Sequence, residues 1–259
     1  MKVLLPSHGI LGQRAVELKL PTFKVLYELQ SYNQDELLRK YKFVELISDA
    51  DLSHITAMDL DYLYYIGAFS LSFNTIKYRP RCVYGCDVKL EKKINISDLN
   101  IIEIKVSNKN IPFIKRINGK KYKYSIISAK QMLEAYEWAQ FEEDSESAFQ
   151  DAQVAAIMGR EVSDRDYVQS LPISVYAGAF LFQRLNYHGL DCESTVKCSK
   201  CGRLSRFRFQ INTSLLQYDI DKIMARYVSV SDTVSLGDFM AMSIVDYNAM
   251  VGALNNKLR

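Results

Sequence analysis

Hydrophobic and polar residues alternate along the chain with two different periods. Residues 16–20 change character at every position, a period that predicts a strand. The segment DELLRKYKFVELI at 35–47 instead repeats its apolar residues at helical spacing, which gives the expected helix one apolar face. Similar helical patterns recur further along, separated by short strands. The sequence therefore predicts an α+β fold in which helix predominates.

Signals for helix starts stand where two of these patterns begin. Ser128 and Gln131 have the spacing of a capping box, in which the first and fourth residues each bind the backbone N–H of the other. Thr56 and Asp59 have the same spacing. We therefore expect helices to begin directly after residues 56 and 128.

Another helix is predicted from Pro172, because proline suits the first helical turn. Gly189 is expected to end it, and His188 beside this glycine is interpreted as a surface or capping residue. Gly178 in this helix and Gly67 in an earlier one are expected to permit close helix packing. The face expected to turn inward comprises Val175, Gly178, Phe182 and Leu185.

The chain repeats an order of short motifs. YIGAF at 65–69 precedes one pair of cysteines and YAGAF at 176–180 precedes another, and each pair is followed by a strand-like segment that begins with IN. We infer a tandem duplication with a first repeat at 1–106 and a second at 107–219. The alternative is two unrelated halves that share the GAF string by coincidence. Residues 220–259 have no counterpart and are expected to form a C-terminal helical extension.

Each repeat carries two cysteines on a predicted turn, in CVYGC (Cys82 and Cys86) and in CSKCG (Cys198 and Cys201). Thiolates two or three residues apart can share one metal ion, and two such turns complete a tetrahedral shell. We expect the four side chains to hold a structural zinc ion in a zinc-ribbon-like knuckle at the junction of the repeats. The open alternative is a set of buried thiols without metal. Cys192 is interpreted as a spare thiol.

Composition narrows the function classes. Of 259 residues, 48% are hydrophobic and 24% are charged, and the net charge of +3 is too mild to require a nucleic-acid partner. No signal peptide and no apolar run of about 18 residues is evident, so we expect no membrane association and a reducing cytosol. In that compartment, paired cysteines favour metal binding over disulfides. Phosphate-binding glycine loops and the HExxH and GxSxG motifs are absent from the sequence, so we do not expect an enzyme.

The extension contains one further predicted helix, capped by Ser235 and Asp238. Its apolar stripe comprises Met240, Ile244, Tyr247, Val251 and Leu254. Such a stripe packs either on the core of its own chain or on a partner chain, and both interpretations stay open.

Two other functions remain as alternatives. RLSRFRF at 203–209 mixes arginine with phenylalanine, so a zinc-ribbon nucleic-acid-binding protein could place Arg203, Arg206 and Arg208 on phosphates. Period-two alternation, which continues through Phe209 and Ile211, explains the same pattern as a half-exposed strand. An enzyme that uses Cys82 or Cys198 as its reactive thiol is the other alternative.

The string LLPSHG at 4–9 is followed by a strand, a charged helix, the tyrosine-rich segment DYLYYIGAF and a cysteine knuckle that leads into a strand. Over about its first 105 residues the chain resembles the baseplate proteins of T-even type bacteriophages, the hub assembly proteins and hub assembly chaperones of contractile tails. Its CxxxC spacing departs from the family's CxxC.

The resemblance implies a non-enzymatic role in building the tail baseplate, as a transient chaperone or a retained subunit. The implied partners are other baseplate hub or tail proteins. The implied location is the host bacterial cytoplasm during assembly, or the virion tail baseplate afterwards. We expect contacts through the tyrosine-bearing helix faces and the helix at 235–254, with zinc holding the repeats in register.

Overall fold

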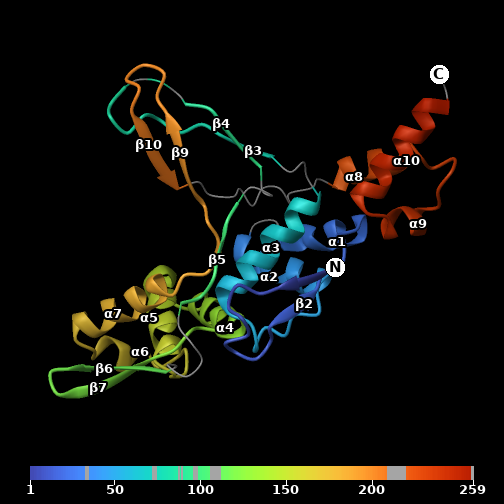
Figure 1. The fold of residues 1–259 in the computed structure, drawn as a ribbon. Coiled ribbons are helices and arrows are strands. Elements are labelled where there is room, and N and C mark those ends of the chain that lie inside the picture. Colours follow the sequence, from blue (N-terminus) through green and yellow to red (C-terminus); the bar gives the residue numbers. More distant parts are fainter. Residues whose placement is uncertain are drawn as a thin grey trace. The chain divides into compact units, whose positions relative to one another are not determined.

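The structure, a computed structural model, combines helices with short two-stranded sheets (Figure 1). It describes residues 1–32, 35–71, 75–86, 88, 90–95, 99–105, 112–208 and 220–257. Mixed helix and strand, with helix in the majority, agrees with the predicted class. None of the helices in these ranges is both long and apolar enough to cross a membrane.

Two compact units make up the fold. Unit 1 comprises Met1–Leu18, Ser48–Leu63 and Ile102–Gly189, and unit 2 comprises Lys19–Ile47, Tyr64–Ile101 and Leu190–Arg259. Each unit takes segments from both predicted repeats, so the boundaries of the units differ from those of the repeats at 1–106 and 107–219. The predicted junction between the two repeats lies at segment 106–111, and the junction between the second repeat and the extension lies at segment 209–219. Both segments lie outside the described residues.

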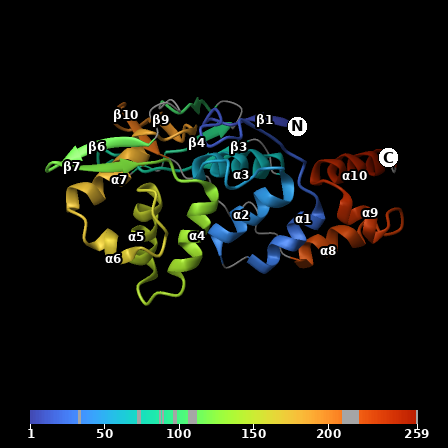
Figure 2. The same cartoon turned by 90° about the horizontal axis from the view of Figure 1, so that it is seen from below.

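Unit 1 opens with a hairpin of β1 (Lys2–Leu4) and β2 (Ala15–Glu17), in which Val3 pairs with Val16. A second hairpin joins β6 (Phe113–Ile117) to β7 (Lys120–Tyr124). The helices of this unit are α4 (Ala129–Ala139), α5 (Ser145–Ile157), α6 (Arg165–Gln169) and α7 (Ile173–Leu185). In Figure 2 the β6–β7 hairpin runs along one side of these helices.

The core of unit 1 joins the helices to the inner face of β7. Its buried side chains include Tyr124, Ile127, Val154, Ile157, Val168, Val175, Ala179 and Phe182. A Cβ atom on Gly178 would lie 2.9 Å from the Tyr124 hydroxyl oxygen, closer than real Cβ contacts allow. The expected role of this glycine in close packing is therefore confirmed.

The predicted helix starts of this unit are confirmed. The Ser128 hydroxyl accepts the Gln131 N–H at 3.1 Å, and the Gln131 side chain accepts the Ser128 N–H at 3.0 Å. Thr56 and Asp59 exchange the same two bonds, at 2.9 and 3.1 Å, at the start of α3 (Ala57–Leu71), whose remaining part belongs to unit 2. Pro172 occupies the N-cap of α7.

The predicted end of α7 is wrong. The helix ends at Leu185, with Asn186 as its C-cap, whereas Gly189 adopts φ +128° and begins β8 (Gly189–Leu190), which pairs with β5 (Ile101–Ile102). Leu185 is 65% exposed rather than turned inward, and Ala179 is buried on the inner face. The chain leaves the helix at Asn186, and the buried residues that follow, including His188, belong to a different segment of backbone.

Unit 2 contains the remaining helices and two more hairpins. Its first helices are α1 (Phe23–Glu28), the 3-10 turn η1 (Leu29–Tyr32) and α2 (Glu36–Ile47). Its hairpins pair β3 (Thr75–Tyr78) with β4 (Lys92–Asn95) and β9 (Glu193–Lys197) with β10 (Leu204–Arg208). The chain ends with α8 (Ile220–Val228), α9 (Leu236–Ala241) and α10 (Ile244–Lys257).

The predicted C-terminal helix is in fact two helices. Ser235 caps α9 as expected, but the chain leaves helical geometry at Met242 and a new cap follows, in which the Ser243 hydroxyl accepts the Asp246 N–H at 3.1 Å. The Phe23 N–H donates to the Met242 carbonyl at this break.

The inner side chains of α9 and α10 pack on α1. The Phe23 ring lies 4.3 Å from that of Phe239 and 5.6 Å from that of Tyr247. The stripe therefore packs on the protein's own core at its two buried positions, Ile244 and Tyr247. The Leu254 side chain lies outside the described residues.

The order of elements is the same in both halves of the chain. A hairpin, a capped helix, further helices and a cysteine-bearing hairpin follow one another in residues 2–95 and again in residues 113–208. This parallel agrees with the inferred duplication, which itself stays a prediction.

Candidate metal centre

The first cysteine pair lies on the loop between β3 and β4. The Gly85 N–H donates to the Cys82 carbonyl at 3.3 Å, and Gly85 adopts φ +77°, which glycine reaches without strain. The Leu90 N–H donates to the Pro80 carbonyl at 2.9 Å and closes the loop. The chain is thereby folded back so that Cys82 and Cys86 lie on the same side.

The second pair lies at the turn between β9 and β10. The Gly202 N–H donates to the Cys198 carbonyl at 2.9 Å, and the Cys198 N–H donates to the Arg203 carbonyl at 2.9 Å. Gly202, directly after Cys201, adopts φ +70°. Gly85 and Gly202 therefore each adopt a positive φ that glycine reaches without strain.

The two loops converge within unit 2. All four sulfur atoms lie within 4.8 Å of one another, and the Cys82 and Cys201 Sγ atoms are 3.8 Å apart. A tetrahedral ion with metal–sulfur bonds of about 2.3 Å requires sulfur–sulfur distances of about 3.8 Å. The predicted approach of Cys82, Cys86, Cys198 and Cys201 is confirmed, and their arrangement is compatible with a metal ion. Cys192 is not a member of this cluster.

The cluster is apolar on one side and open on the other. Cys198 is 1% exposed and Cys82 6%, and they pack with Leu90, while Cys86 is half-buried and Cys201 is exposed. A metal ion held here would be shielded on its inner side and reachable from solvent through Cys201.

Polar groups favour a thiolate at one position of the cluster. Hydrogen bonding from the Tyr84 backbone N–H lowers the pKa of Cys82 to about 6, and the buried Ser205 hydroxyl donates to the same sulfur at 3.8 Å. Hydrogen bonding to Cys201 raises the pKa of Cys86 to about 12. A thiolate is therefore readily formed at Cys82, whereas Cys86 keeps its proton unless a cation offsets the repulsion between neighbouring thiolates.

The arginines of the nucleic-acid alternative already have partners in unit 2. The Arg203 guanidinium lies over the Tyr84 ring, 5.1 Å from its centre, and so connects the two loops on their outer side. Arg206 forms an ion pair with Glu193 on the neighbouring strand. Phe209 and Ile211, the last residues of the proposed alternation, lie outside the described residues.

Sequence analysis did not predict a buried polar cluster in unit 1. His188 is 0% exposed, so its interpretation as a surface residue is wrong, whereas its contact with Asn186, the C-cap of α7, agrees with a capping role. Its Nε2 atom lies 2.6 Å from the Thr56 hydroxyl and 3.9 Å from an Asp59 carboxylate oxygen, and its Nδ1 atom lies 2.8 Å from the Asn186 carbonyl. Burial lowers the pKa of His188.

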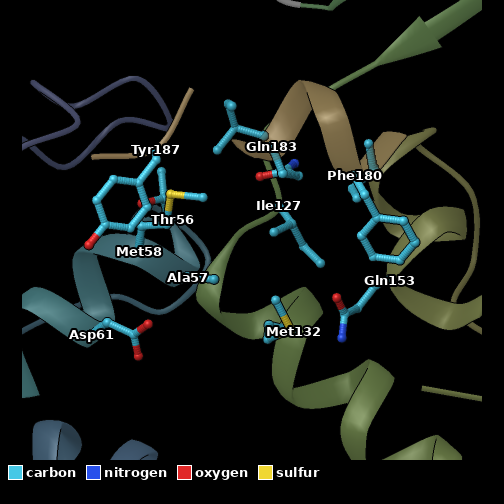
Figure 3. Close-up of a pocket in the computed structure, with 12 residues that line it drawn as sticks. Thr56, Ala57, Met58, Asp61, Ile127, Met132, Gln153, Phe180, Gln183 and Tyr187 are labelled. Atoms are coloured by element: carbon cyan, nitrogen blue, oxygen red, sulfur yellow. The ribbon is translucent and has the colours of Figure 1, made fainter. Parts of the chain in front are cut away.

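A cavity of about 260 Å³ adjoins this cluster in unit 1 (Figure 3). Ile127, Met132 and Phe180 provide much of its apolar lining. The Gln183 amide at its edge donates to the Ser125 carbonyl at 2.9 Å and so has a structural partner. Neither cysteine nor histidine is present among the described lining residues.

No protein-family model matches the chain, and no curated protein or solved structure is significantly similar to it. What the four cysteines can bind therefore follows from their own geometry and chemistry.

Proposed function

We propose that this protein is a zinc-stabilised, non-catalytic component of contractile phage tail assembly, which acts by binding baseplate hub or tail proteins as a hub component or chaperone. The single observation that carries the zinc assignment is the convergence of Cys82, Cys86, Cys198 and Cys201 to within 4.8 Å.

Sulfur ligands in a tetrahedron select zinc or iron among the common metals. A cysteine-rich knuckle at the turn of a two-stranded hairpin is a frequent setting for structural zinc. Four protein thiolates fill the coordination shell, so no position is left for a water or substrate. These arguments favour a structural role over hydrolytic catalysis.

The assembly role rests on the family resemblance. In the structure, the LLPSHG motif contacts the start of the helix that contains the second motif, DYLYYIGAF. In the LLPSHG segment, Ser7 is buried and its N–H donates to the Asp59 carboxylate at 3.1 Å. Asp59 lies in the first turn of α3, the helix that contains DYLYYIGAF. A buried hydrogen bond therefore connects the LLPSHG segment to the first turn of the helix that contains DYLYYIGAF.

Elemental analysis of purified protein tests the zinc assignment. We expect about one zinc per chain, and a Cys198→Ser/Cys201→Ser variant is expected to lose it. Cys192→Ser serves as the matched control and is expected to keep the metal. Iron in place of zinc, or no metal in freshly purified wild-type protein, would contradict the assignment.

Binding assays with separately purified hub and tail proteins of the same phage test the assembly role. We expect at least one of them to bind the zinc-loaded chain, with nucleic acid of the same molar concentration as the negative control. Binding to DNA or RNA with a steep salt dependence, and to none of the tail proteins, would instead favour the nucleic-acid alternative.

A further inference from the structure

The β6–β7 hairpin of unit 1 carries an unusual concentration of positive charge. Between Phe113 and Tyr124 no acidic residue occurs, and the cationic residues are Lys115, Arg116, Lys120, Lys121 and Lys123. All five are exposed, and none forms an ion pair with another residue in the described part of the chain. The hairpin closes at Asn118 and Gly119, whose φ angles of 49° and 78° suit a tight two-residue turn.

The two faces of the hairpin have different roles. Phe113, Tyr122 and Tyr124 lie on the inner face, where the rings of Phe113 and Tyr124 stack on Phe182 of α7. Because side chains alternate along a strand, Lys115, Ile117 and Lys120 share that inner face. The opposite, solvent-exposed face consists of Ile114, Arg116, Lys121 and Lys123.

The outer face places like charges against each other. Arg116 pairs directly with Lys121 across the hairpin, and Lys123 pairs with Ile114. Like charges at opposed positions destabilise a sheet, so folding alone does not favour this arrangement. A cationic surface of this kind is stabilised when a partner supplies carboxylates or phosphates.

The edges of the hairpin are open as well. Within the described residues β6 and β7 pair with each other and with no third strand. In an antiparallel pair closed by a two-residue turn, the residues next to the turn bond to each other, so the residues of the outer face direct their backbone groups outward. The same residues thus offer both cationic side chains and unpaired strand-edge groups.

We propose that the β6–β7 hairpin is a docking element for an extended acidic segment of a partner protein, which adds as a strand to an open edge and sets its carboxylates against Arg116, Lys121 and Lys123. The inference rests on the proposed protein-binding function and adds the chemistry of the partner. Backbone pairing supplies affinity in such strand addition, and the alternating side chains supply specificity.

A protein partner suits this surface better than nucleic acid. The apolar residue among the outer cations is Ile114, an aliphatic side chain that is 53% exposed and offers no ring for base stacking. The Phe113 and Tyr124 rings already stack on Phe182, and Tyr122 packs against the core of unit 1. Three outer cations would also neutralise few phosphates.

The test uses full-length, zinc-loaded protein and a labelled ten-residue peptide that alternates glutamate with valine. Fluorescence anisotropy is expected to show salt-sensitive binding. The Arg116→Glu/Lys121→Glu variant is expected to bind at least tenfold more weakly. Lys19→Glu/Lys105→Glu, two exposed lysines elsewhere, gives the same change of net charge and is expected to stay within twofold of wild type.

Two further measurements separate docking from folding. The single variant Arg116→Glu creates an attractive pair with Lys121, so its melting temperature is expected to equal or exceed that of wild type although it binds the peptide less well. A peptide with the same charges but alternate N-methylated amides cannot pair as a strand and is expected to bind at least tenfold more weakly. Equal binding of this peptide would overturn strand addition.

Other outcomes separate this inference from the proposed function. If the wild-type protein does not bind the peptide, the acidic-segment proposal is wrong. It is also wrong if the wild-type protein binds a 20-base-pair duplex more tightly than the peptide and the double variant no longer binds that duplex. If hub proteins bind wild type and the double variant equally, the hairpin proposal fails while the assembly role stands. If the peptide binds as expected and no hub or tail protein does, the hairpin proposal stands and the assembly role fails.

Discussion

At Gly67 a missing side chain sets the distance between two helices of unit 2. A Cβ atom there would overlap Ile47 and lie 2.8 Å from a ring carbon of Phe43, both on α2. We predict that Gly67→Ala lowers the free energy of unfolding by about 1–3 kcal/mol, because overpacking outweighs the better helix propensity of alanine. Urea denaturation measures the difference.

Gly252→Ala is the matched control for this prediction. Gly252 lies in α10, where an added Cβ would meet no atom within 4 Å. We expect this change to raise stability by about 0.5–1 kcal/mol, since alanine loses less backbone entropy in a helix. A Gly67 variant as stable as the Gly252 variant would show that α2 and α3 can move apart at no cost.

His188 is expected to make stability depend on pH. Burial lowers its pKa in the folded protein, and Asp59 partly opposes this effect, while His8 adds to it. Below the ordinary histidine pKa of about 6.5 the unfolded chain therefore binds more protons than the folded one, so stability falls as the pH falls.

The variant His188→Gln tests this pH dependence. At pH 8 it is expected to be less stable by about 1–3 kcal/mol, because the bonds to Thr56 and Asn186 are weakened. Between pH 7 and pH 5 its urea midpoint is expected to fall less than that of wild type. Other titrating groups, including the cysteines, are shared by both proteins and cancel in the comparison; parallel curves would contradict the assignment.

For Thr56, sequence reasoning predicted the local partner and missed the distant one. The Thr56–Asp59 capping box follows from a spacing of three residues. The bond from Thr56 to His188 spans 132 positions, and no local pattern encodes it. A histidine next to a glycine is usual in a turn, so its surface interpretation followed from neighbours that do not determine its burial.

Among the secondary-structure elements, α9 is held by one aromatic side chain. Phe239 is fully buried, stacks on Phe23 and lies 5.4 Å from the ring of Tyr227 in α8. We predict that Phe239→Ala lowers the free energy of unfolding by about 3–5 kcal/mol, as expected for a large cavity. Hydrogen exchange is expected to increase first in α8, α9 and α10.

Leu236→Ala on the same helix is the control, because Leu236 is 45% exposed. Its effect is expected to stay below about 1 kcal/mol. Comparable losses for both variants would mean that helix propensity, rather than packing on α1, stabilises α9.

The break between α9 and α10 shows why a continuous apolar stripe is a poor guide to helix boundaries. The apolar stripe continues at helical spacing across Met242, so periodicity alone gives one helix. Ser243 and Asp246 form a second cap signal of the same type as Ser235 and Asp238, and this signal was available in the sequence. At the break between α9 and α10, the capping signal rather than the periodic apolar stripe gives the helix boundary correctly.

At the scale of the whole molecule, metal binding is expected to stabilise unit 2 selectively. A link between Cys82 and Cys201 closes a loop of 119 positions, and closing a loop of about this length removes roughly 4–5 kcal/mol of chain entropy from the unfolded state. We predict that a strong chelator lowers the unfolding free energy by at least this order and exposes β3, β4, β9 and β10 to hydrogen exchange.

The core of unit 1 gives the internal reference for that experiment. Exchange at Val154 and Val175 is expected to stay unchanged after chelation, because both residues belong to unit 1. Simultaneous loss of protection in both units would contradict a local effect. Readdition of zinc is expected to restore the hairpins.

The convergence of the cysteines was predictable because their chemistry demands it, whatever the path of the chain between them. The division into units was not, because it depends on contacts between segments such as 64–101 and 190–259 that no periodicity relates. The repeats inferred from GAF and cysteine strings describe the order of elements, whereas the units describe which elements pack together.

The positions of the four cysteines along the chain determine when the metal site can form during biosynthesis. The two halves of the sulfur cluster are separated in the chain by Ile102–Gly189, the longest segment of unit 1. During translation the ribosome therefore releases this entire segment before the second knuckle emerges. Ion capture is then among the last steps of maturation, and a nascent chain stalled before Cys198 would carry half a site, open to rival metals or to oxidation.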